Sequence, residues 1–559
     1  MMKKIRGEIG KSRKPRILII AGMILMVVAC GLSVIAGGVA YGASTDSSKS
    51  TFQDESANNA TTIASSKRVD ALSYRMSLKL DTRKNALKET VTMRFRNNTD
   101  GTVREIWIRD MTPAKLRYDM KNYPESNKKL KTKISSITLK GSSKQLKVKY
   151  KKKRSAIKVD LGAKGKLKPG ETGAITVRLK THIPDRADRF GYQKTKKGKL
   201  YALSFCFPYL ADNLNGKWQL DPYFDDGESR SWDLADYNVT FRAPVSYKVA
   251  ATGKVVKTTV KGSKSTAKST KAKAKIGITK IKARNVRDFA IVACNFMAKD
   301  SFDVEGIRVN NYYLSGKHKA EYRKLTRLVA EDSIRLYTQQ LGECPYDEID
   351  IAPCLFGFGF GGMEYPGLIM TNASSTFNTS LPDYMSLSDG LSHELGHQWF
   401  YAAVGNREYK EAWIDEGFTT YIERDIYGLY DGDAYKYLSK IDDLTPTIDK
   451  MKEDRDYLIE TARKDYKGVF INIPPDKYPR GRDYGEVEYM ASYCFLEEVR
   501  LRMGDEKFAE FLRGYYNKYK MDVVTTRDVV NYIKEYDKSR EMQEIIDFYI
   551  AGYQRGQVQ

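Results

Sequence analysis

Histidine and cysteine are both scarce in this chain, which has four histidines and six cysteines among 559 residues. Cys30 lies within a long apolar segment, and the other five cysteines form an odd set without regular spacing. This pattern argues against a disulfide framework and against a thiolate metal site. Cys344 and Cys354 are close enough in sequence to bridge, but buried free thiols are the simpler interpretation. Because histidines are so few, two of them at a defined spacing are informative.

Long hydrophobic runs are also absent, with one exception. Hydrophobic residues make up 41% of the chain and charged residues 30%, a composition typical of a soluble globular protein rather than a disordered or fibrous one. The exception is residues 17–40, which carry no charge. At about 1.5 Å per helical residue, this segment could cross a hydrocarbon core of roughly 30 Å. Residues 1–16 are rich in Lys and Arg, and we expect such a basic segment to remain cytoplasmic.

We therefore expect residues 17–43 to anchor the protein as a single span in the cell membrane, with the rest of the chain extracellular. Two alternatives are a cleaved signal peptide, which would leave a secreted protein, and a lipoprotein signal ending at Cys30. All three place the body of the protein outside the cytoplasm. Residues 44–66 are polar and rich in Ser and Thr, which is typical of a disordered stalk.

Residues 67–298 alternate apolar and polar side chains with a period of two, and turn signals such as residues 168–170 separate the runs. We expect an antiparallel all-β domain of many strands. The charge is unevenly distributed, because residues 299–559 carry about −13 and residues 1–298 about +38 of the net charge of +25. This asymmetry predicts that the two parts have different roles.

Lysines in residues 257–282 alternate with small or branched side chains. One interpretation is a solvated outer face of a sheet. The other is attraction to anionic cell-envelope polymers or lipid headgroups. Aromatic side chains are not interleaved with the lysines, and the expected extracellular location also argues against nucleic acid as a partner.

Beyond residue 315 the apolar spacing becomes helical. Helices are predicted to end at Gly342, Gly405 and Gly428, because glycine commonly follows the last helical residue. Short strand-like runs occur at residues 347–354 and 367–374. Residues 299–559 are thus predicted to form an α+β domain that is mostly helical toward its C-terminal end.

The most informative stretch of the chain is LSHELGHQWF, residues 391–400. In a helix His393 and His397 project from one face, and both imidazoles can reach one zinc ion. Given the histidine content, this H-E-x-x-H pattern should arise by chance on the order of once in 500 such chains. Glu416, in the sequence WIDEGF, follows His397 at a distance that allows it to face back as a third ligand.

Two nitrogens and one carboxylate oxygen with an open fourth position form the usual catalytic zinc set, so we expect one Zn²⁺ per chain. Such an ion lowers the pKa of its water toward about 7 and polarises a carbonyl group. Glu394, beside His393, is placed to take a proton from the water and to return one to the leaving nitrogen. The pattern therefore predicts hydrolysis of a peptide bond or a similar bond.

The stretch HELGHQWFYAAVGNREYKEAWIDEGFTTYIE, residues 393–423, resembles the catalytic segment of the aminopeptidase N-type family of zinc peptidases, the gluzincins. The resemblance implies a thermolysin-like catalytic domain, and residues 217–255 resemble the saddle-like N-terminal domain of the family. Larger members add a helical C-terminal domain, for which this sequence has no counterpart. We therefore expect a more open cleft.

Residues 361–365, GGMEY, resemble the G-x-M-E-N exopeptidase motif of that family. The resemblance implies that Glu364 binds the α-ammonium group of a substrate and that the extended strand Gly361, Gly362 and Met363 lies along the substrate backbone. Tyr365 stands in place of the Asn of the motif.

The family also uses a tyrosine that donates a hydrogen bond to the tetrahedral oxyanion. The resemblance of residues 489–508 to the helix that follows this tyrosine assigns the role to Tyr489, with Tyr484 and Tyr493 as alternatives.

The sequence as a whole predicts a membrane-anchored, extracellular zinc aminopeptidase that acts on peptides with a free N-terminus. The first alternative is a zinc endopeptidase with an open cleft. The second is a cell-surface binding scaffold with an inactive peptidase fold, although the retention of His393, His397, Glu416 and Glu394 argues against it.

Overall fold

The computed structural model describes residues 67–552, apart from residues 215, 226, 228–232, 262–274, 358–360, 375, 378 and 381. The predicted basic segment, anchor and stalk, residues 1–66, lie outside the described residues. Within the described part of the chain, no helix combines the length and the apolar character needed to span a bilayer. The described residues belong to one compact unit.

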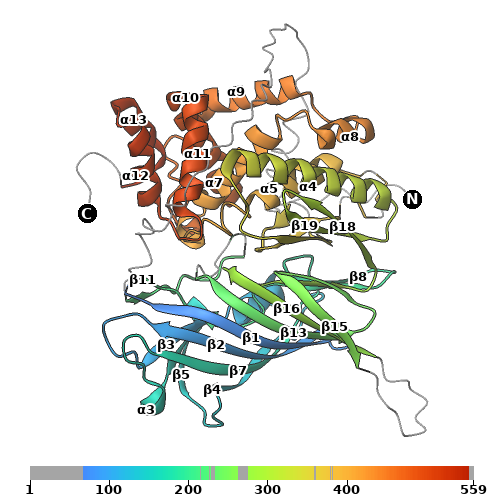
Figure 1. The fold of residues 1–559 in the computed structure, drawn as a ribbon, viewed down its shortest axis with the longest axis vertical. Coiled ribbons are helices and arrows are strands. Elements are labelled where there is room, and N and C mark those ends of the chain that lie inside the picture. The colour runs from blue at the N-terminus through green and yellow to red at the C-terminus, as the bar shows by residue number, and fades with distance from the viewer. Residues whose placement is uncertain are drawn as a thin grey trace, which may run out of the picture. The chain divides into compact units, whose positions relative to one another are not determined.

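The first part of this unit is built on a seven-stranded sheet with the strand order β15-β16-β13-β1-β2-β7-β4 (Figure 1). Its strands are β1 (Val69–Asp81), β2 (Ala86–Asn97), β4 (Thr132–Leu139), β7 (Thr172–His182), β13 (Ala235–Pro244), β15 (Lys254–Lys261) and β16 (Ile276–Val286). Buried and exposed residues alternate along β1 and β2, as the period-two pattern predicts. The sheet therefore has one face in the core and one in solvent.

Two smaller sheets and a hairpin accompany the large sheet. One sheet has the strand order β10-β3-β6-β5 and consists of β3 (Glu105–Arg109), β5 (Lys147–Lys151), β6 (Ala156–Asp160) and β10 (Tyr209–Leu210). The other has the order β14-β17-β9-β8 and consists of β8 (Phe190–Lys194), β9 (Lys199–Leu203), β14 (Lys248–Ala251) and β17 (Ile291–Cys294). The hairpin pairs β11 (Asn213–Leu214) with β12 (Lys217–Trp218). Side chains of all three sheets, such as Val91, Ile106 and Tyr201, share one hydrophobic core.

Two details differ from the expectation of an antiparallel all-β domain. β1 and β13 pair in parallel, from Ser73 opposite Asp236 to Lys79 opposite Arg242. A period-two pattern fixes which side chains share a face, but it does not fix the direction in which a strand joins its neighbour. The region also contains the helix α2 (Thr112–Asn122), the short helix α3 (Gly162–Gly165) and the 3₁₀ turn η1 (Lys152–Arg154).

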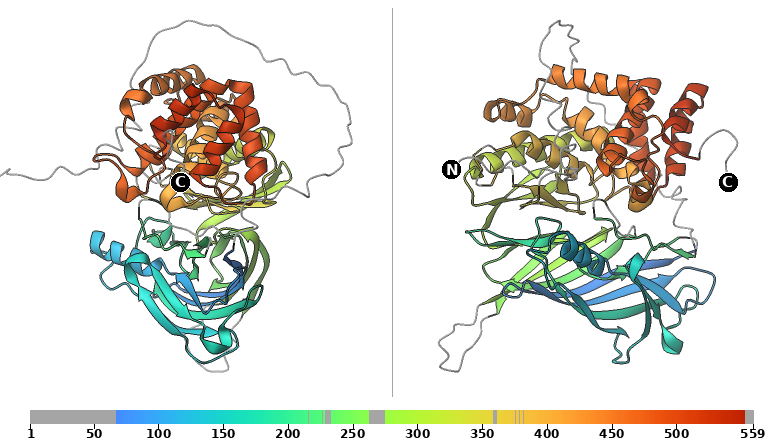
Figure 2. Two further views of the ribbon diagram at one scale, coloured as in Figure 1. Left: turned by 90° about the vertical axis from the view of Figure 1, so that its left-hand side faces the viewer. Right: turned by 180° about the vertical axis from the view of Figure 1, so that it is seen from behind.

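The second part of the unit begins with a five-stranded sheet in the order β18-β19-β20-β22-β21. Its strands are β18 (Met297–Val304), β19 (Ile307–Leu314), β20 (Glu348–Cys354), β21 (Gly362–Met363) and β22 (Leu368–Asn372). In all views this five-stranded sheet lies between the helices and the first part of the unit, residues 67–296, which we call the β-sheet part (Figures 1 and 2). The edge strand β21 is antiparallel to β22 and carries part of the predicted substrate-binding stretch.

Helices make up most of the remaining chain. They are α4 (Lys319–Leu341), α5 (Tyr384–Gly396), α6 (Glu408–Glu411), α7 (Trp413–Tyr421), the π-helix η2 (Ile422–Tyr427), α8 (Asp433–Ile441), α9 (Ile448–Asp465), the 3₁₀ turn η3 (Pro475–Lys477), the π-helix η4 (Gly485–Ala491), α10 (Ser492–Met503), α11 (Asp505–Tyr519), α12 (Thr526–Tyr536) and α13 (Arg540–Tyr549). The expected order, β-sheet region, then mixed region, then helices, is confirmed.

Two of the three predicted helix ends are confirmed. Gly342 follows α4 with a φ of 123°, and Gly428 follows η2. The helix predicted to reach Gly405 instead ends at Gly396. Residues 397–404 form turns, in which the amide of Tyr401 donates to the carbonyl of Val404 at 2.8 Å. Gly405 pairs with residue 523 and does not cap a helix.

The five described cysteines, at positions 206, 294, 344, 354 and 494, are all free. The predicted alternative of a bridge between Cys344 and Cys354 is therefore wrong, and the interpretation as free thiols holds. Four of the five are buried. Burial raises the pKa of Cys294, Cys344 and Cys494 to about 12, which keeps these thiols protonated and unreactive at neutral pH.

Candidate metal centre

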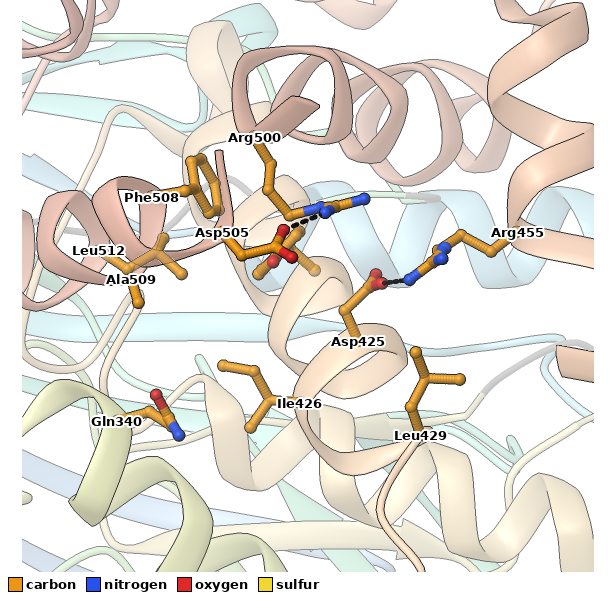
Figure 3. Close-up of a pocket in the computed structure, with 11 residues that line it drawn as sticks. Gln340, Asp425, Ile426, Leu429, Arg455, Arg500, Asp505, Phe508, Ala509 and Leu512 are labelled. Carbon is orange, nitrogen blue, oxygen red and sulfur yellow. Dashed lines mark hydrogen bonds and ion pairs between the residues drawn. The ribbon is translucent and has the colours of Figure 1, made fainter. Parts of the chain in front are cut away.

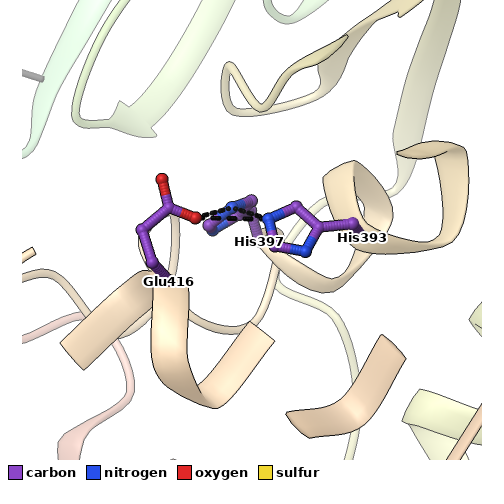
Figure 4. Close-up of side chains that lie close together, drawn as sticks. All are labelled: His393, His397 and Glu416. Atoms are coloured by element: carbon purple, nitrogen blue, oxygen red, sulfur yellow. Dashed lines mark hydrogen bonds and ion pairs between the residues drawn. The ribbon is translucent and has the colours of Figure 1, made fainter. Parts of the chain in front are cut away.

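Two imidazole rings meet at the C-terminal end of α5. His393 lies in its last turn, and His397 is the residue that follows the helix, still with helical dihedral angles. The two Nε2 atoms are 3.0 Å apart, and both side chains are buried. Figure 4 shows both rings turned toward the same point in front of the helix.

Glu416, in the first turn of α7, completes the cluster. Its Oε2 atom lies 3.2 Å from Nε2 of His393 and 3.2 Å from Nε2 of His397. The three side chains form the one group of potential metal ligands found among the described residues (Figure 4). The structure thus brings together the three residues that the spacing in the sequence predicted to be ligands.

Hydrogen bonds on the far side of each ring fix the direction of the Nε2 lone pairs. Nδ1 of His393 lies 3.2 Å from the Glu423 carboxylate, and Nδ1 of His397 lies 3.0 Å from the carbonyl oxygen of Phe400. A neutral imidazole that donates from Nδ1 has an unprotonated Nε2. Two lone pairs and a carboxylate oxygen then converge on one point, which is repulsive unless a cation lies between them.

The charges around the rings also favour a cation. Burial lowers the pKa of His393, but hydrogen bonds to Glu416 and Glu423 outweigh burial and raise this pKa well above its usual value. Burial raises the pKa of Glu416, but the His397 and His393 imidazoles outweigh this and hold it well below its usual range. The raised pKa of His393 indicates surroundings that stabilise positive charge, and the lowered pKa of Glu416 indicates that its carboxylate stays ionised, as a metal ligand must be.

The separations fit a zinc ion. Tetrahedral zinc, with bonds of about 2.0–2.1 Å to nitrogen and oxygen, holds its ligand atoms about 3.3 Å apart. The observed separations among the three ligand atoms are 3.0–3.2 Å. The outer hydrogen bonds from Glu423 and the Phe400 carbonyl are the kind that orient histidine ligands in zinc sites. The His-His-Glu triad therefore fits one Zn²⁺.

The edge strand β21 lies against Glu394, the residue after the first histidine. A Cβ atom on Gly362 would lie 2.5 Å from Cγ of Glu394 and 2.7 Å from its Oε1, so a side chain at this position would displace the Glu394 carboxylate. Gly361, one residue earlier, has open space around its Cα. Glu364 and Met363 are buried. The predicted proton acceptor and the predicted substrate-binding strand are thus in direct contact.

Gln398 fixes this strand to the end of α5. Its Oε1 accepts a hydrogen bond from the amide of Gly367 at 2.8 Å, and its Nε2 donates to the carbonyl of Glu364 at 3.3 Å. Gln398 directly follows His397, so one short stretch holds both a metal ligand and the segment that carries Glu364. Nothing in the sequence pattern marks this glutamine as part of the site.

Tyr489, on the π-helix η4, is the tyrosine that the structure brings to the centre. Its hydroxyl donates to Oε1 of Glu416 at 2.8 Å, and its ring centroid lies 5.6 Å from that of His393. Burial and the Glu416 carboxylate raise the pKa of Tyr489 well above its usual value, so the phenol remains a hydrogen-bond donor. Tyr484 packs edge-on against Tyr489, whereas Tyr493 lies against the guanidinium of Arg424.

One contact to the centre comes from the β-sheet part of the chain. Arg287, directly after β16, is fully buried, and its Nε donates to the carbonyl of Tyr401 at 2.9 Å. Its Nη2 donates to the carbonyl of Ala403, also at 2.9 Å. Tyr401 has a φ of 105°, which strains a side chain other than glycine by about 1–3 kcal/mol. Phe400, whose carbonyl accepts from His397, is the residue before it.

A separate cavity of about 230 Å³ lies among η2, α10 and α11, and none of the three clustered ligands lines it. Figure 3 shows that its charged side chains are engaged with one another, Asp425 with Arg455 and Arg500 with Asp505. This cavity is therefore not part of the metal centre.

Residues 330–549 match the Peptidase family M1 domain. This match covers the part of the chain that holds His393, His397 and Glu416. Aminopeptidase B of Rattus norvegicus is 30% identical over 194 residues, which cover 34% of this chain and 27% of that protein. Leucine aminopeptidase 2 of Candida albicans is 26% identical over 231 residues, which cover 39% of this chain and 35% of that protein. The matches span about a third or less of these relatives.

Solved structures of M1 peptidases have the same fold. An M1 zinc metallopeptidase from Deinococcus radiodurans is 15% identical with a TM-score of 0.55, covering 88% of this chain and 95% of that chain. A mutant of that protein bound to a Tyr-Ser-Ala substrate is 16% identical with a TM-score of 0.55 and the same coverage. Another of these structures is described as a two-domain M1 metallopeptidase, with a TM-score of 0.56 at 15% identity over 86% of this chain and 94% of that one.

Gly362→Ala tests the contact between β21 and Glu394. The added methyl group must displace the carboxylate, and displacement of about 1 Å at a catalytic group can cost about a hundredfold in rate. We expect kcat/KM for an aminoacyl anilide to fall by about that factor while the zinc content is unchanged. Gly390→Ala is the matched control, since its Cβ would meet the same strand at an ordinary 3.6 Å. Equal activity of the two variants would contradict this assignment.

Arg287→Lys tests whether the β-sheet part supports the metal centre. The compact ammonium group of lysine cannot replace the planar fork with which Arg287 reaches the carbonyls of Tyr401 and Ala403 from two different nitrogens. We expect the turn at Tyr401 to relax and the Phe400 carbonyl to move away from His397. We expect zinc affinity, measured by competition with a chelator, to fall by about 10–100-fold.

Tyr312→Phe is the control for this experiment. It removes another hydrogen bond between the two parts, from Tyr312 to the carbonyl of Val249, which does not reach the centre. If both variants bind zinc as tightly as the unchanged chain, Arg287 has only a structural role.

Proposed function

We propose that the chain is a zinc aminopeptidase that removes N-terminal residues from peptides. The observation that carries the proposal is the buried Glu364, which directly follows the strand that contacts Glu394. Its carboxylate also helps to raise the pKa of Tyr489, the residue that donates to the ligand Glu416. A buried carboxylate at this place is suited to bind an α-ammonium group. Binding of that group would fix the first peptide bond, rather than an internal one, at the reactive point.

The three ligands would be His393, His397 and Glu416. Zinc, when bound, supplies Lewis-acid polarisation of the scissile carbonyl and lowers the pKa of water. The Glu394 carboxylate accepts the proton of the attacking water and delivers a proton to the leaving nitrogen. The Tyr489 hydroxyl, which donates to Glu416 in this structure, is close enough to donate instead to the oxyanion that develops from the substrate carbonyl.

The strand from Gly361 to Met363 would align the substrate. β21 is an edge strand, so its outer backbone groups are open to pairing with an extended peptide. Gly362 keeps the backbone close to Glu394, and Gln398 holds the segment beyond it. The names of the relatives support the proposal, since aminopeptidase B and leucine aminopeptidase 2 are aminopeptidases by name.

For the location we propose a single membrane span at residues 17–43, with the peptidase outside the cell. The support is the uncharged segment 17–40 and the basic residues that precede it. Protease protection of the full chain in sealed vesicles, with and without detergent, tests this orientation. A cleaved N-terminus in the mature protein would replace the proposal with a secreted form.

Glu364→Ala tests the assignment as an aminopeptidase. Loss of a carboxylate that binds an ammonium group should reduce kcat/KM for leucine anilide by about a hundredfold, since charged hydrogen bonds contribute about 1.5–3 kcal/mol. Cleavage of an N-acetylated internal peptide should change far less. Glu394→Gln is the control that should lose both activities while retaining zinc. If Glu364→Ala lost activity equally on leucine anilide and on the N-acetylated peptide, binding of the substrate amine by Glu364 would be excluded. Preferred cleavage of N-acetylated peptides by the unchanged chain would indicate an endopeptidase.

A further inference from the structure

The solvent face of the seven-stranded sheet is strongly basic. Along β1 the buried side chains Tyr74, Met76 and Leu78 point into the core, whereas Arg75 and Lys79 are exposed. The other strands of the sheet follow the same alternation. We call the exposed side the outer face.

Five cations stand in one line across five adjacent strands of the outer face. Strand register places each of them directly opposite the next, and the five strands lie side by side in the order β4-β7-β2-β1-β13 (Figure 1). This cation row consists of Lys133, Lys180, Lys88, Lys79 and Arg242.

The cation row is electrostatically unfavourable for the isolated protein. Neighbouring strands lie about 4.8 Å apart, so the row extends over roughly 19 Å. Like charges directly opposite each other destabilise a sheet, and the spacing is below the Debye length of about 8 Å at physiological salt. In the described part of the chain none of the four lysines forms an ion pair, and Arg242 donates only to the hydroxyl of Ser77, at 2.8 Å.

The acidic residue nearest to the row in β2 faces the other way. Glu89, next to Lys88, is buried in the core, where burial raises the pKa of its carboxyl group well above the usual value. Its side chain therefore points away from the row and forms no ion pair with it.

The neighbouring rows add hydroxyl groups and further cations. One register step away, Thr90, Ser77 and Thr240 lie between Arg178 and Lys280. Cations flanked by hydroxyl groups are the donors that proteins use for phosphate oxygens. No aromatic side chain is exposed on the described outer face, which disfavours single-stranded nucleic acid, whose bases stack on aromatic rings.

We propose that the cation row binds a linear, flexible polymer with repeating phosphate groups, lying across the strands. The geometry of the row favours a linear ligand, because the cations follow one line with one charge on each strand. The charge of about +38 in residues 1–298 would draw such a polymer to this part of the chain. The proposal does not depend on the peptidase activity.

The experiment is a binding titration of the full chain, kept in neutral detergent, with long-chain inorganic polyphosphate as the probe. The test variant is Lys79→Gln/Lys88→Gln/Lys180→Gln. The matched control is Lys147→Gln/Lys149→Gln/Lys152→Gln, which removes the same charge from exposed positions on and beside β5, in another sheet.

We expect the test variant to bind about tenfold or more weakly, and the slope of log K against log salt to shrink by about 2, since each lost contact contributes about 0.7. The control should lose less than about threefold. Hydrolysis of an aminoacyl anilide should be unchanged in both variants, which verifies that they are folded.

Three outcomes would overturn the proposal. Equal losses of affinity in the two variants would show that binding depends only on the net charge of the protein and not on the cation row. Absence of polyphosphate binding by the unchanged chain would rule out a phosphate polymer as the ligand. Tighter, row-dependent binding to single-stranded DNA or to vesicles of anionic lipid than to polyphosphate would assign the row to a nucleic acid or a membrane instead.

Discussion

The structure depends on the convergence of two imidazole nitrogens and one carboxylate oxygen within 3.0–3.2 Å of one another. Each histidine is held by a hydrogen bond on its far side, so neither ring can turn its lone pair away without losing that bond. A cation converts this repulsion into binding, because the same atoms then become ligands. The ligands come from the end of α5 and the first turn of α7, and η4 brings Tyr489 to the same point.

A buried side chain of the β-sheet part, that of Arg287, supports the centre. Arg287 binds the carbonyls of the strained turn that follows His397, so the metal centre depends on residues from both parts of the described chain. Gln398, in the same turn, donates to the carbonyl of Glu364, and Gly362 of the adjoining strand lies against Glu394 in α5. Orientation of the metal ligands and orientation of the substrate are thus two functions of one short segment.

The sequence was sufficient to predict the order of the parts and the pair His393 and His397, because helical spacing places side chains on one face regardless of tertiary context. Glu416 was predicted from its distance along the chain, which allows the next helix to face back toward the histidines. Glu423 lies two turns after Glu416 and could have been found by the same rule. Arg287 could not, because its role is set by contacts between segments far apart in the chain. The parallel pairing of β1 with β13 and the early end of α5 likewise depend on tertiary pairing, which local periodicity does not encode.

The central claim is that the three converging side chains hold one catalytic zinc ion, and its most direct test is a zinc titration of the metal-free chain. Zinc content and hydrolysis of leucine anilide are measured together after removal of metal with a chelator. We expect no hydrolysis by the metal-free chain and full recovery of hydrolysis at one zinc per chain. Hydrolysis by the metal-free chain, or recovery that fails to follow occupancy of one site, would contradict it.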